Sequence, residues 1–83
     1  MKNERLKWAC RRGMLELDML LTPFYDKYFH TLTAEQKHIF EELLSHQDPE
    51  LFDWFIGFSA PKDQKLQTMI QLIKNAKVIE HDH

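Results

Sequence analysis

Apolar residues recur along this chain with the period of an α-helix almost from end to end. The longest stripe covers residues 17–29, where apolar side chains fall three, four, seven and eleven positions apart. Shorter stripes of the same kind follow over residues 39–44, 51–55 and 66–76. This spacing is typical of helices with one buried side, and the sequence therefore predicts an all-α protein.

The first two helices are expected to meet at Gly13. The first covers roughly residues 3–11 and ends near that glycine, because glycine leaves helical geometry easily. The second follows at once, and Gly13 is a candidate for its hinge or N-cap. Pro23 lies inside the second stripe, where proline removes one backbone donor and clashes with the preceding turn. We expect a kink in a continuous helix there in preference to a break into two helices.

Capping signals mark the next two helices. Thr33 and Gln36 have the spacing of a capping box, which predicts the start of a third helix. Asp48 followed by proline predicts an N-cap and the first turn of a fourth helix over roughly residues 49–56. Gly57 is expected to end that helix.

A fifth helix is predicted to begin at Pro61 and to end near Val78, which leaves residues 79–83 as a frayed tail. Because the connections are short, successive helices should pack as neighbours in a compact five-helix bundle. We expect one domain over residues 1–83 with an ordered core of about 3–78. Each helix has one apolar stripe and no second face to bury, which favours a monomer.

Composition supports the helical interpretation and narrows the function. Residues of high helix propensity greatly outnumber the β-branched ones, and Val78 is the only valine. A chain of 83 residues can build only one modest core, and a substrate pocket of ordinary size would consume much of it. The sequence therefore favours a protein that works through its surface over an enzyme.

Charge is distributed unevenly. Residues 1–12 hold five of the eleven Lys and Arg residues and one acidic residue, whereas the rest of the chain is net acidic. The basic end is a candidate contact surface for an acidic protein partner, although a solvated helix would look the same. Nucleic acid is disfavoured, because no helix-turn-helix or zinc-finger pattern accompanies the charge.

The single cysteine, Cys10, excludes an internal disulfide and fits a reducing compartment. It shares an apolar helical face with Leu6 and Ala9, so we expect a buried structural thiol and not a nucleophile. No apolar run is long enough to span a membrane, and the N-terminus lacks the apolar core of a signal peptide. These features predict a cytoplasmic protein without direct membrane insertion.

Chemical motifs are scarce. The five histidines lack the spacing of a zinc site and are interpreted as surface residues: His30, His38, His46, His81 and His83. Ser45 and Ser59 lie at predicted helix ends without a nucleophile-elbow pattern. With two glycines and no predicted strands, the chain cannot cradle a dinucleotide alone, so any dinucleotide contact must be completed by another protein. We predict no catalytic residues, no metal and no cofactor of its own.

Aromatic residues are expected to divide into two groups. Phe52, Phe55 and Phe58 are interpreted as core residues of the fourth helix region. Trp8 and Trp54 lie off the apolar faces of their helices, and a half-exposed tryptophan is a good interface anchor. Wrapping around a helix edge is the ordinary alternative for both.

The run from Arg12 to Glu16 allows two interpretations. In the structural one, Gly13 is a hinge or N-cap, Glu16 occupies the third position of the next helix, and Arg12 pairs with Glu16. Such an exposed pair is worth only about 0.2–1 kcal/mol, so stability gives little reason to demand these identities. In the functional one, bare backbone between an exposed cation and an exposed anion lets a partner surface approach closely. The residues alone do not decide between them.

From residue 6 to about residue 73 the chain resembles the FAD assembly factors of succinate dehydrogenase, small five-helix proteins of bacteria and mitochondria. The resemblance rests on the run from Trp8 to Asp18, on Pro23-Phe24, and on the segment 48–52 with Trp54. The family's RGxxE signature falls on Arg12, Gly13 and Glu16, with the accompanying acidic residue at Asp18. Only the C-terminal tail, from about Lys74, departs freely.

This resemblance implies a chaperone-like assembly factor that binds the flavoprotein subunit of succinate dehydrogenase, and in some bacteria that of fumarate reductase. Such a factor promotes bond formation between the flavin C8-methyl carbon and a histidine of the partner, in a largely autocatalytic reaction. The implied partner-binding residues are Arg12, Gly13 and Glu16, with Arg11, Asp18 and Trp8 beside them. An antitoxin-like regulator of a small membrane-associated toxin is the alternative, since such a role has also been described for relatives.

Overall fold

The computed structural model describes the backbone of residues 2–81 and the side chains of residues 6–76, and within that part of the chain the fold is all-α. Five α-helices follow one another, with a single 3-10 turn after the second. Their bounds are α1 Lys2–Ala9, α2 Leu15–Tyr28, the 3-10 turn Phe29–Thr31, α3 Ala34–Leu44, α4 Asp48–Ile56 and α5 Gln64–His81. The predicted five-helix architecture is confirmed.

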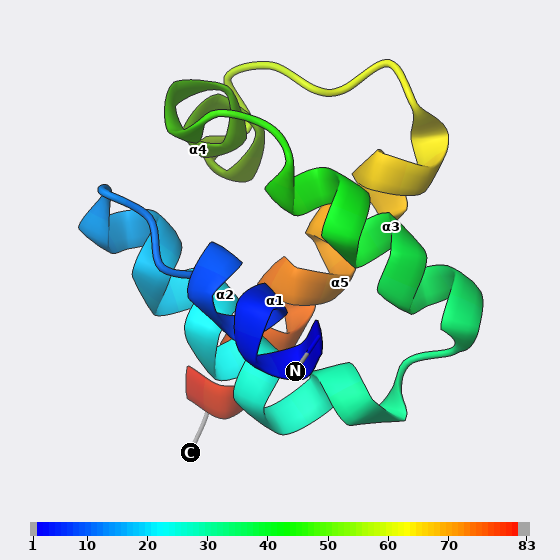
Figure 1. Cartoon of the computed structure of the whole chain (residues 1–83). Coiled ribbons are helices and arrows are strands. Elements are labelled where there is room, and N and C mark those ends of the chain that lie inside the picture. Colours follow the sequence, from blue (N-terminus) through cyan, green and yellow to red (C-terminus); the bar gives the residue numbers. More distant parts are fainter. Residues whose placement is uncertain (1, 82–83) are drawn as a thin grey trace.

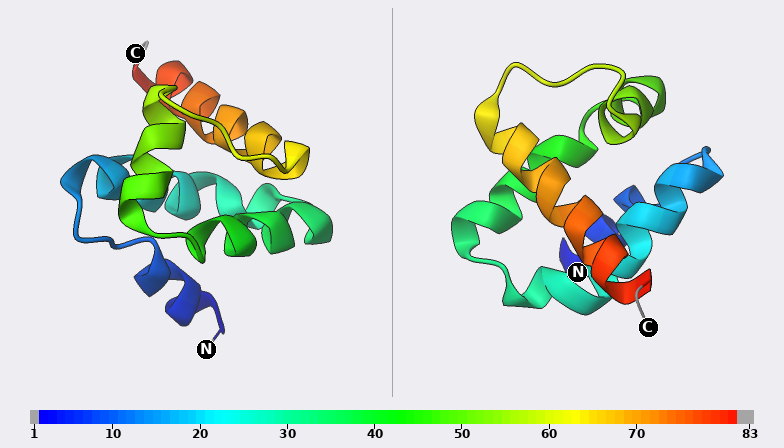
Figure 2. Two further views of the ribbon diagram at one scale, coloured as in Figure 1. Left: turned by 90° about the horizontal axis from the view of Figure 1, so that it is seen from above. Right: turned by 180° about the vertical axis from the view of Figure 1, so that it is seen from behind.

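Helix α5 lies at the centre of the arrangement. It packs against α2, α3 and α4, and α2 also contacts α4. Figure 1 shows α5 running behind α2 and α3, and the second view in Figure 2 brings it to the front. Helix α1 lies at the edge of the bundle. The first α-helix therefore has few neighbours, and buried Leu6, the Lys7–Asp26 ion pair and the contacts of residues 10–14 hold it against the bundle.

One cluster of buried apolar side chains fills the interior, drawn from all five α-helices and from the 3-10 turn. Phe24, Tyr25 and Phe29 surround Phe40, with ring centroids 5.6, 6.4 and 5.7 Å from the Phe40 ring. Offset and tilted ring pairs at such separations add to the stabilisation that comes from buried area. The four apolar stripes predicted from the sequence supply most of this core, and Leu6 and Cys10 add to it.

Helix α2 continues through Pro23 without a non-helical segment. The break that proline could have caused is absent, and the helix buries Leu17, Leu21, Phe24 and Tyr25 on one side. Burial of that stripe outweighs the hydrogen bond that Pro23 cannot donate.

Local signals at two other helix ends are also confirmed. Thr33 accepts a hydrogen bond from the Gln36 amide, and the Gln36 side chain accepts one from the Thr33 amide, as a capping box requires. At the end of α4, Gly57 adopts a left-handed conformation with φ of 83°. The amides of Gly57 and Phe58 donate to the carbonyls of Trp54 and Asp53, at 3.3 and 2.9 Å, which is the Schellman pattern.

The prediction that Pro61 starts the fifth helix is wrong, because α5 begins at Gln64. Pro61 is buried in the preceding connection, and its carbonyl accepts a hydrogen bond from the Gln67 side chain at 2.6 Å. The helix also runs to His81, three residues beyond its predicted end. Residues 82–83 of the predicted tail lie outside the described residues, and fraying of 79–83 stays a prediction.

Two aromatic assignments are also wrong. Trp54 is buried at 8% exposure, packed edge-on against the His46 ring at 4.9 Å, so it is not a half-exposed anchor. Phe58 is 80% exposed and lies outside the core. Phe52 is half-buried against the core, and Phe55 is buried as expected. Helix α4 is rotated toward Trp54 compared with the face that its phenylalanines suggested.

Candidate functional site

The RGxxE signature lies at the junction between α1 and α2, which we define as residues 10–14. Helix α1 is prolonged by two turn hydrogen bonds, from the Cys10 amide to Lys7 and from the Arg11 amide to Trp8, at 3.1 and 3.0 Å. Helix α2 has Met14 as its N-cap, without a side-chain cap. Gly13 is therefore not the N-cap, and Glu16 is the second and not the third residue of α2, because the helix begins later than the pattern suggested.

Arg12 is the structural centre of this junction. Its Nε donates to Asp48 Oδ1 at 2.7 Å, and its Nη1 donates to the carbonyls of Ala9 and Leu44, both at 2.9 Å. Its Nη2 donates to the His46 carbonyl. The carbonyls of Ala9 and Leu44 end α1 and α3, where helices leave carbonyl groups without partners. One guanidinium thus joins the ends of α1 and α3 to the start of α4.

These contacts correct two expectations about Arg12. Its side chain is 14% exposed and pairs with Asp48, not with Glu16, so it is not an exposed cation. The planar fork of arginine carries five N–H donors, and four are used here in fixed directions. Stability therefore gives a strong reason for arginine at this position.

Two carboxylates from different helices hold consecutive backbone amides of the junction. The Arg12 amide donates to Asp18 of α2, and the Gly13 amide donates to Asp48 Oδ2 at 3.1 Å. Asp48 was predicted as the N-cap of α4, but that position belongs to Gln47, and α4 begins without a side-chain cap. Its carboxylate is directed away from its own helix toward Arg12 and Gly13.

The outer side of the junction carries exposed residues, among them four of the six predicted partner-binding residues. Trp8 is 69% exposed, and the Arg11 guanidinium lies over its ring at 5.7 Å from the ring centroid. Gly13 and Glu16 are also exposed. Within the described residues, no hydrogen bond or ion pair involves the Glu16 side chain. We call Trp8, Arg11, Gly13 and Glu16 the outer face of the junction.

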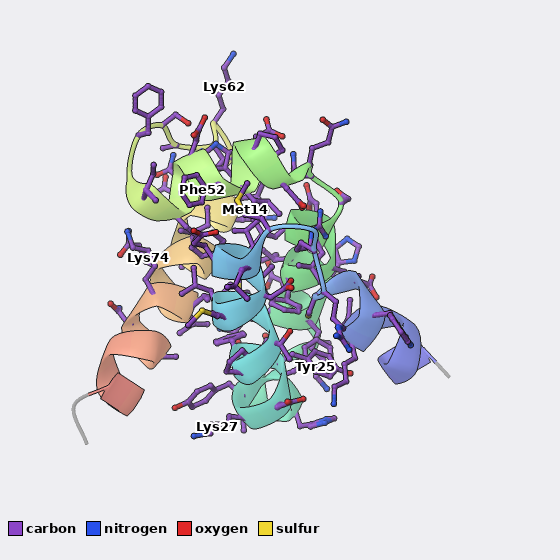
Figure 3. All side chains as sticks on the ribbon, turned by 90° about the vertical axis from the view of Figure 1, so that its left-hand side faces the viewer. Met14, Tyr25, Lys27, Phe52, Lys62 and Lys74 are labelled. Atoms are coloured by element: carbon purple, nitrogen blue, oxygen red, sulfur yellow. The ribbon has the colours of Figure 1, made fainter. Side chains whose placement is uncertain are left out.

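Sequence reasoning missed two apolar members of this region. Leu15 is 69% exposed and Met19 is 52% exposed, one helical turn apart on α2. Both positions lie outside the buried apolar stripe of α2, and this departure from the helical period was the signal in the sequence that they are exposed. Figure 3 shows Met14 between the start of α2 and α4, so the inner side of the same turn is packed while the outer side is open.

Gly13 is unlike most glycines at a helix junction. Its φ is not positive, since Gly57 is the glycine in the described chain with that conformation. A Cβ built on Gly13 would meet Asp48 Oδ2 at 3.8 Å, an ordinary van der Waals contact. The fold therefore has room for a Cβ here, and none of the residues that the structure describes accounts for the glycine.

The basic N-terminal segment is largely engaged within the described residues. Lys7 pairs with Asp26 at 3.2 Å, and Arg12 is held in the junction. Arg11 is exposed, rests on Trp8 and has no acidic partner among the described residues. The candidate basic contact surface is therefore reduced to Arg11 and to residues before Leu6, whose side chains lie outside the described part.

Cys10 lies beneath this junction and is fully buried, as predicted. Burial raises the pKa of its thiol from the ordinary value of 9.0 to about 12, against the opposing influence of the Arg12 charge. A thiol with so high a pKa supplies no nucleophile near neutral pH. Cys10 therefore contributes packing and not chemistry.

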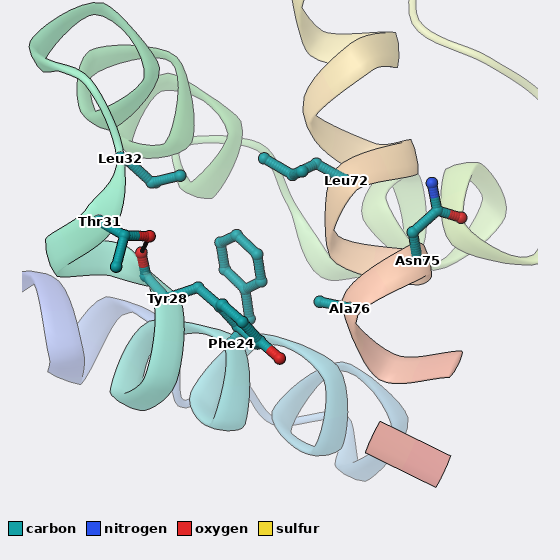
Figure 4. A pocket seen from close by; sticks show the side chains of 7 residues that line it. All are labelled: Phe24, Tyr28, Thr31, Leu32, Leu72, Asn75 and Ala76. Carbon is teal, nitrogen blue, oxygen red and sulfur yellow. Dashed lines mark hydrogen bonds between the residues drawn. The ribbon is translucent and has the colours of Figure 1, made fainter. Parts of the chain in front are cut away.

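Two hollows adjoin α2. One of about 170 Å³ opens between α2 and α5 and is well below the volume of roughly 300–1,000 Å³ typical of small-molecule sites (Figure 4). The other, of about 340 Å³, lies between α1 and α2 and includes Arg11, Asp18 and Met19. It is wide open and belongs to the predicted partner-binding region. Among the described residues, no group of three or more His, Cys, Asp or Glu side chains is arranged to hold a metal ion.

Comparison with known proteins gives concordant matches. A family model described as flavinator of succinate dehydrogenase matches residues 4–77. The FAD assembly factor SdhE of Colwellia psychrerythraea is 55% identical over 75 residues, covering 89% of this chain and 82% of its own. That of Haemophilus influenzae is 45% identical over 75 residues, covering 90% of this chain and 88% of its own.

A solved structure extends the match to three dimensions. The solution structure of a UPF0350 protein has a TM-score of 0.77 and 38% identity, and the match covers 95% of this chain and 85% of that one. No helix in the described part of this chain has both the length and the apolar content to cross a membrane. Nothing in the names of these relatives supports the antitoxin-like alternative.

Proposed function

The chain belongs to the family of flavinators of succinate dehydrogenase, and we propose that it binds the flavoprotein subunit of that enzyme and promotes covalent attachment of FAD to it. Support comes from the match over residues 4–77 and from relatives named FAD assembly factor. The reacting atoms then belong to the partner, whose histidine bonds to the flavin C8-methyl carbon. This chain acts as a helper without a cofactor of its own.

The outer face of the junction is the proposed contact surface. The observation that carries this assignment is Gly13, an exposed glycine that neither its φ nor its surroundings require. A residue without a side chain allows a partner's backbone or a flavin edge to come closer than any other residue would. Glu16, which is exposed and has no partner among the described residues, and Arg11 on Trp8 supply charges of both signs beside it.

The burial of the thiol supports a helper role for this chain. Cys10 is buried with a raised pKa, and the predicted contact residues include no nucleophile. Its contribution is therefore to hold the partner's histidine and flavin in a reactive arrangement and to favour negative charge that develops on the flavin. Arg12 and Asp18, which were predicted contacts, serve in this proposal mainly to shape the surface from within.

We further propose that the chain acts as a cytoplasmic monomer and that the fumarate reductase flavoprotein is a second client. The unpaired, buried Cys10 fits a reducing compartment. The proposal that the fumarate reductase flavoprotein is a second client rests on the family resemblance. Light scattering across a range of concentrations and parallel assays with both flavoproteins test these points.

The proposed function is tested by Gly13→Leu and Glu16→Ala in cells that lack the native factor. We expect both variants to fold, because Gly13 is exposed and a Cβ there makes only an ordinary van der Waals contact, and because the Glu16 substitution removes an exposed side chain. Covalent flavin in the partner, measured by in-gel fluorescence, should fall about tenfold or more. Glu41→Ala is the matched control, since Glu41 is exposed on α3 and none of the hydrogen bonds described for Arg12 and Gly13 goes to it.

Two outcomes would contradict the proposal. If the wild-type chain fails to restore covalent flavin, the assembly-factor function is wrong. If the wild type succeeds and both folded variants match it, the function stands and the site assignment is wrong.

A further inference from the structure

The Asp48 carboxylate contacts the α1–α2 junction and does not cap its own helix, α4. One carboxylate oxygen accepts from Arg12 Nε at 2.7 Å, and the other accepts from the Gly13 amide at 3.1 Å. The two donors come from consecutive residues, 36 and 35 positions earlier in the chain. A carboxylate with four lone-pair sites can serve both donors at once.

We propose that Asp48 is a positioning residue for flavinylation, which presents the Gly13 backbone and the exposed residues beside it in the conformation that the flavoprotein recognises. This inference rests on the proposed function. Asp48 acts through Gly13 and need not touch the partner itself. Its side chain is 26% exposed, since it lies against Arg12 beneath the outer face.

The physical reason is preorganisation. Residues 10–14 connect two helices, and a glycine-containing connection of this kind has many accessible conformations when it is not held. Asp18 holds the Arg12 amide and Asp48 holds the Gly13 amide, so the backbone of the signature is fixed before any partner arrives. A surface ordered in advance does not lose that conformational entropy on binding. If the competent conformer were only fractionally populated, the apparent affinity would fall by that fraction.

Asp48→Asn separates positioning from simple packing. Asparagine has nearly the same shape, but it offers one carbonyl oxygen and one amide donor. It can accept from Arg12 or from Gly13, and its other end then faces an N–H group. Asp53→Asn is the matched control, because Asp53 lies on the same helix and none of the hydrogen bonds described for Arg12 and Gly13 goes to it.

The experiment titrates purified full-length factor against the apo-flavoprotein with FAD and follows the rate of covalent flavin formation. For Asp48→Asn we expect the half-saturating concentration of factor to rise about tenfold, because the binding-competent conformer is less populated. The rate at saturation should be unchanged, because that conformer still forms when enough factor is present. Amide hydrogen exchange measured by NMR should accelerate at Gly13 and stay unchanged at core positions of α3 such as Phe40 and Leu43.

Asp48→Glu covers the case in which Asp48→Asn does not fold. Glutamate keeps the charge beside Arg12 but displaces the carboxylate from the Gly13 amide, so half-saturation should again rise. A folded Asp48 variant with wild-type half-saturation would overturn the inference, while the response to Gly13→Leu would still uphold the proposed function. A lowered saturating rate with unchanged half-saturation would also overturn it, because Asp48 would then act in the chemical step.

Discussion

Two helix junctions in this protein contain a glycine, and the two are built in opposite ways. At the end of α4, Gly57 needs its left-handed φ of 83°, and hydrogen bonds to carbonyls three to five residues earlier close the turn. At the α1–α2 junction, Gly13 has no such conformation, and carboxylates from the adjoining helix α2 and from the distant helix α4 hold the backbone. The first glycine is explained by local geometry and the second is not.

This contrast separates residues required by the fold from residues available for function. Arg12 and Asp48 support the fold, since they connect the ends of α1 and α3 to the start of α4. Gly13 and Glu16 are exposed, and no comparable side-chain contact is made at either position within the described part of the chain. The signature therefore combines the partly buried Arg12 with the exposed Gly13 and Glu16. Substitution of Arg12 should lower stability, whereas substitution of Gly13 or Glu16 should affect function.

The largest expected effect is on stability, from Arg12→Ala. Removing the guanidinium leaves the carbonyls of Ala9 and Leu44 without their donor and Asp48 without its partner. We expect the free energy of unfolding to fall by about 2–4 kcal/mol, because several charge-assisted bonds in a partly buried site are lost together. Urea denaturation followed by circular dichroism measures this change.

Arg11→Ala is the control for that experiment. Arg11 is exposed and rests on Trp8, so its removal should cost no more than about 1 kcal/mol. Equal destabilisation by the two arginine substitutions would show that Arg12 is not the structural centre of the junction.

The second expected effect compares Gly57→Ala with Gly13→Ala. Alanine at position 57 must adopt a left-handed conformation, which costs about 1–2 kcal/mol. Alanine at position 13 adds one atom in ordinary contact distance, so unfolding free energy should change by less than about 0.5 kcal/mol. Thermal melts at equal concentration give both values. Flavinylation should be normal for folded Gly57→Ala; a loss there would extend the contact surface to the α4–α5 connection.

The same contrast explains how much of the molecule the sequence could predict. The capping box at Thr33 and the helix end at Gly57 were correct, because each depends on residues within one or two turns. The predicted roles of Arg12 and Asp48 were wrong, because the contacts that define their actual roles are made with residues more than thirty positions away. Asp48 followed by proline fits an N-cap, and only the folded chain shows its carboxylate directed to another segment.

The predictions for Trp54 and Phe58 were wrong for a related reason. Periodicity within nine residues fixes the buried side of a helix only loosely, and packing decides the final rotation. Trp54 is buried against His46, and Phe58, which follows Gly57, is exposed. Within the candidate site, the exposure of Gly13 and Glu16 agreed with expectation, whereas the inward direction of Arg12 required knowledge of where α3 ends.

The smallest expected effect on stability compares Trp8→Ala with Phe58→Ala. Both side chains are largely exposed, at 69% and 80%, so each substitution should change the unfolding free energy by about 0.5 kcal/mol or less. Their effects on partner binding should differ, because Trp8 lies on the outer face of the α1–α2 junction and Phe58 does not. Calorimetric titration of the flavoprotein should show about tenfold weaker binding for Trp8→Ala and unchanged binding for Phe58→Ala. If instead Phe58→Ala weakened binding and Trp8→Ala did not, the partner would contact the α4–α5 connection, and the exposed tryptophan would be an ordinary surface residue.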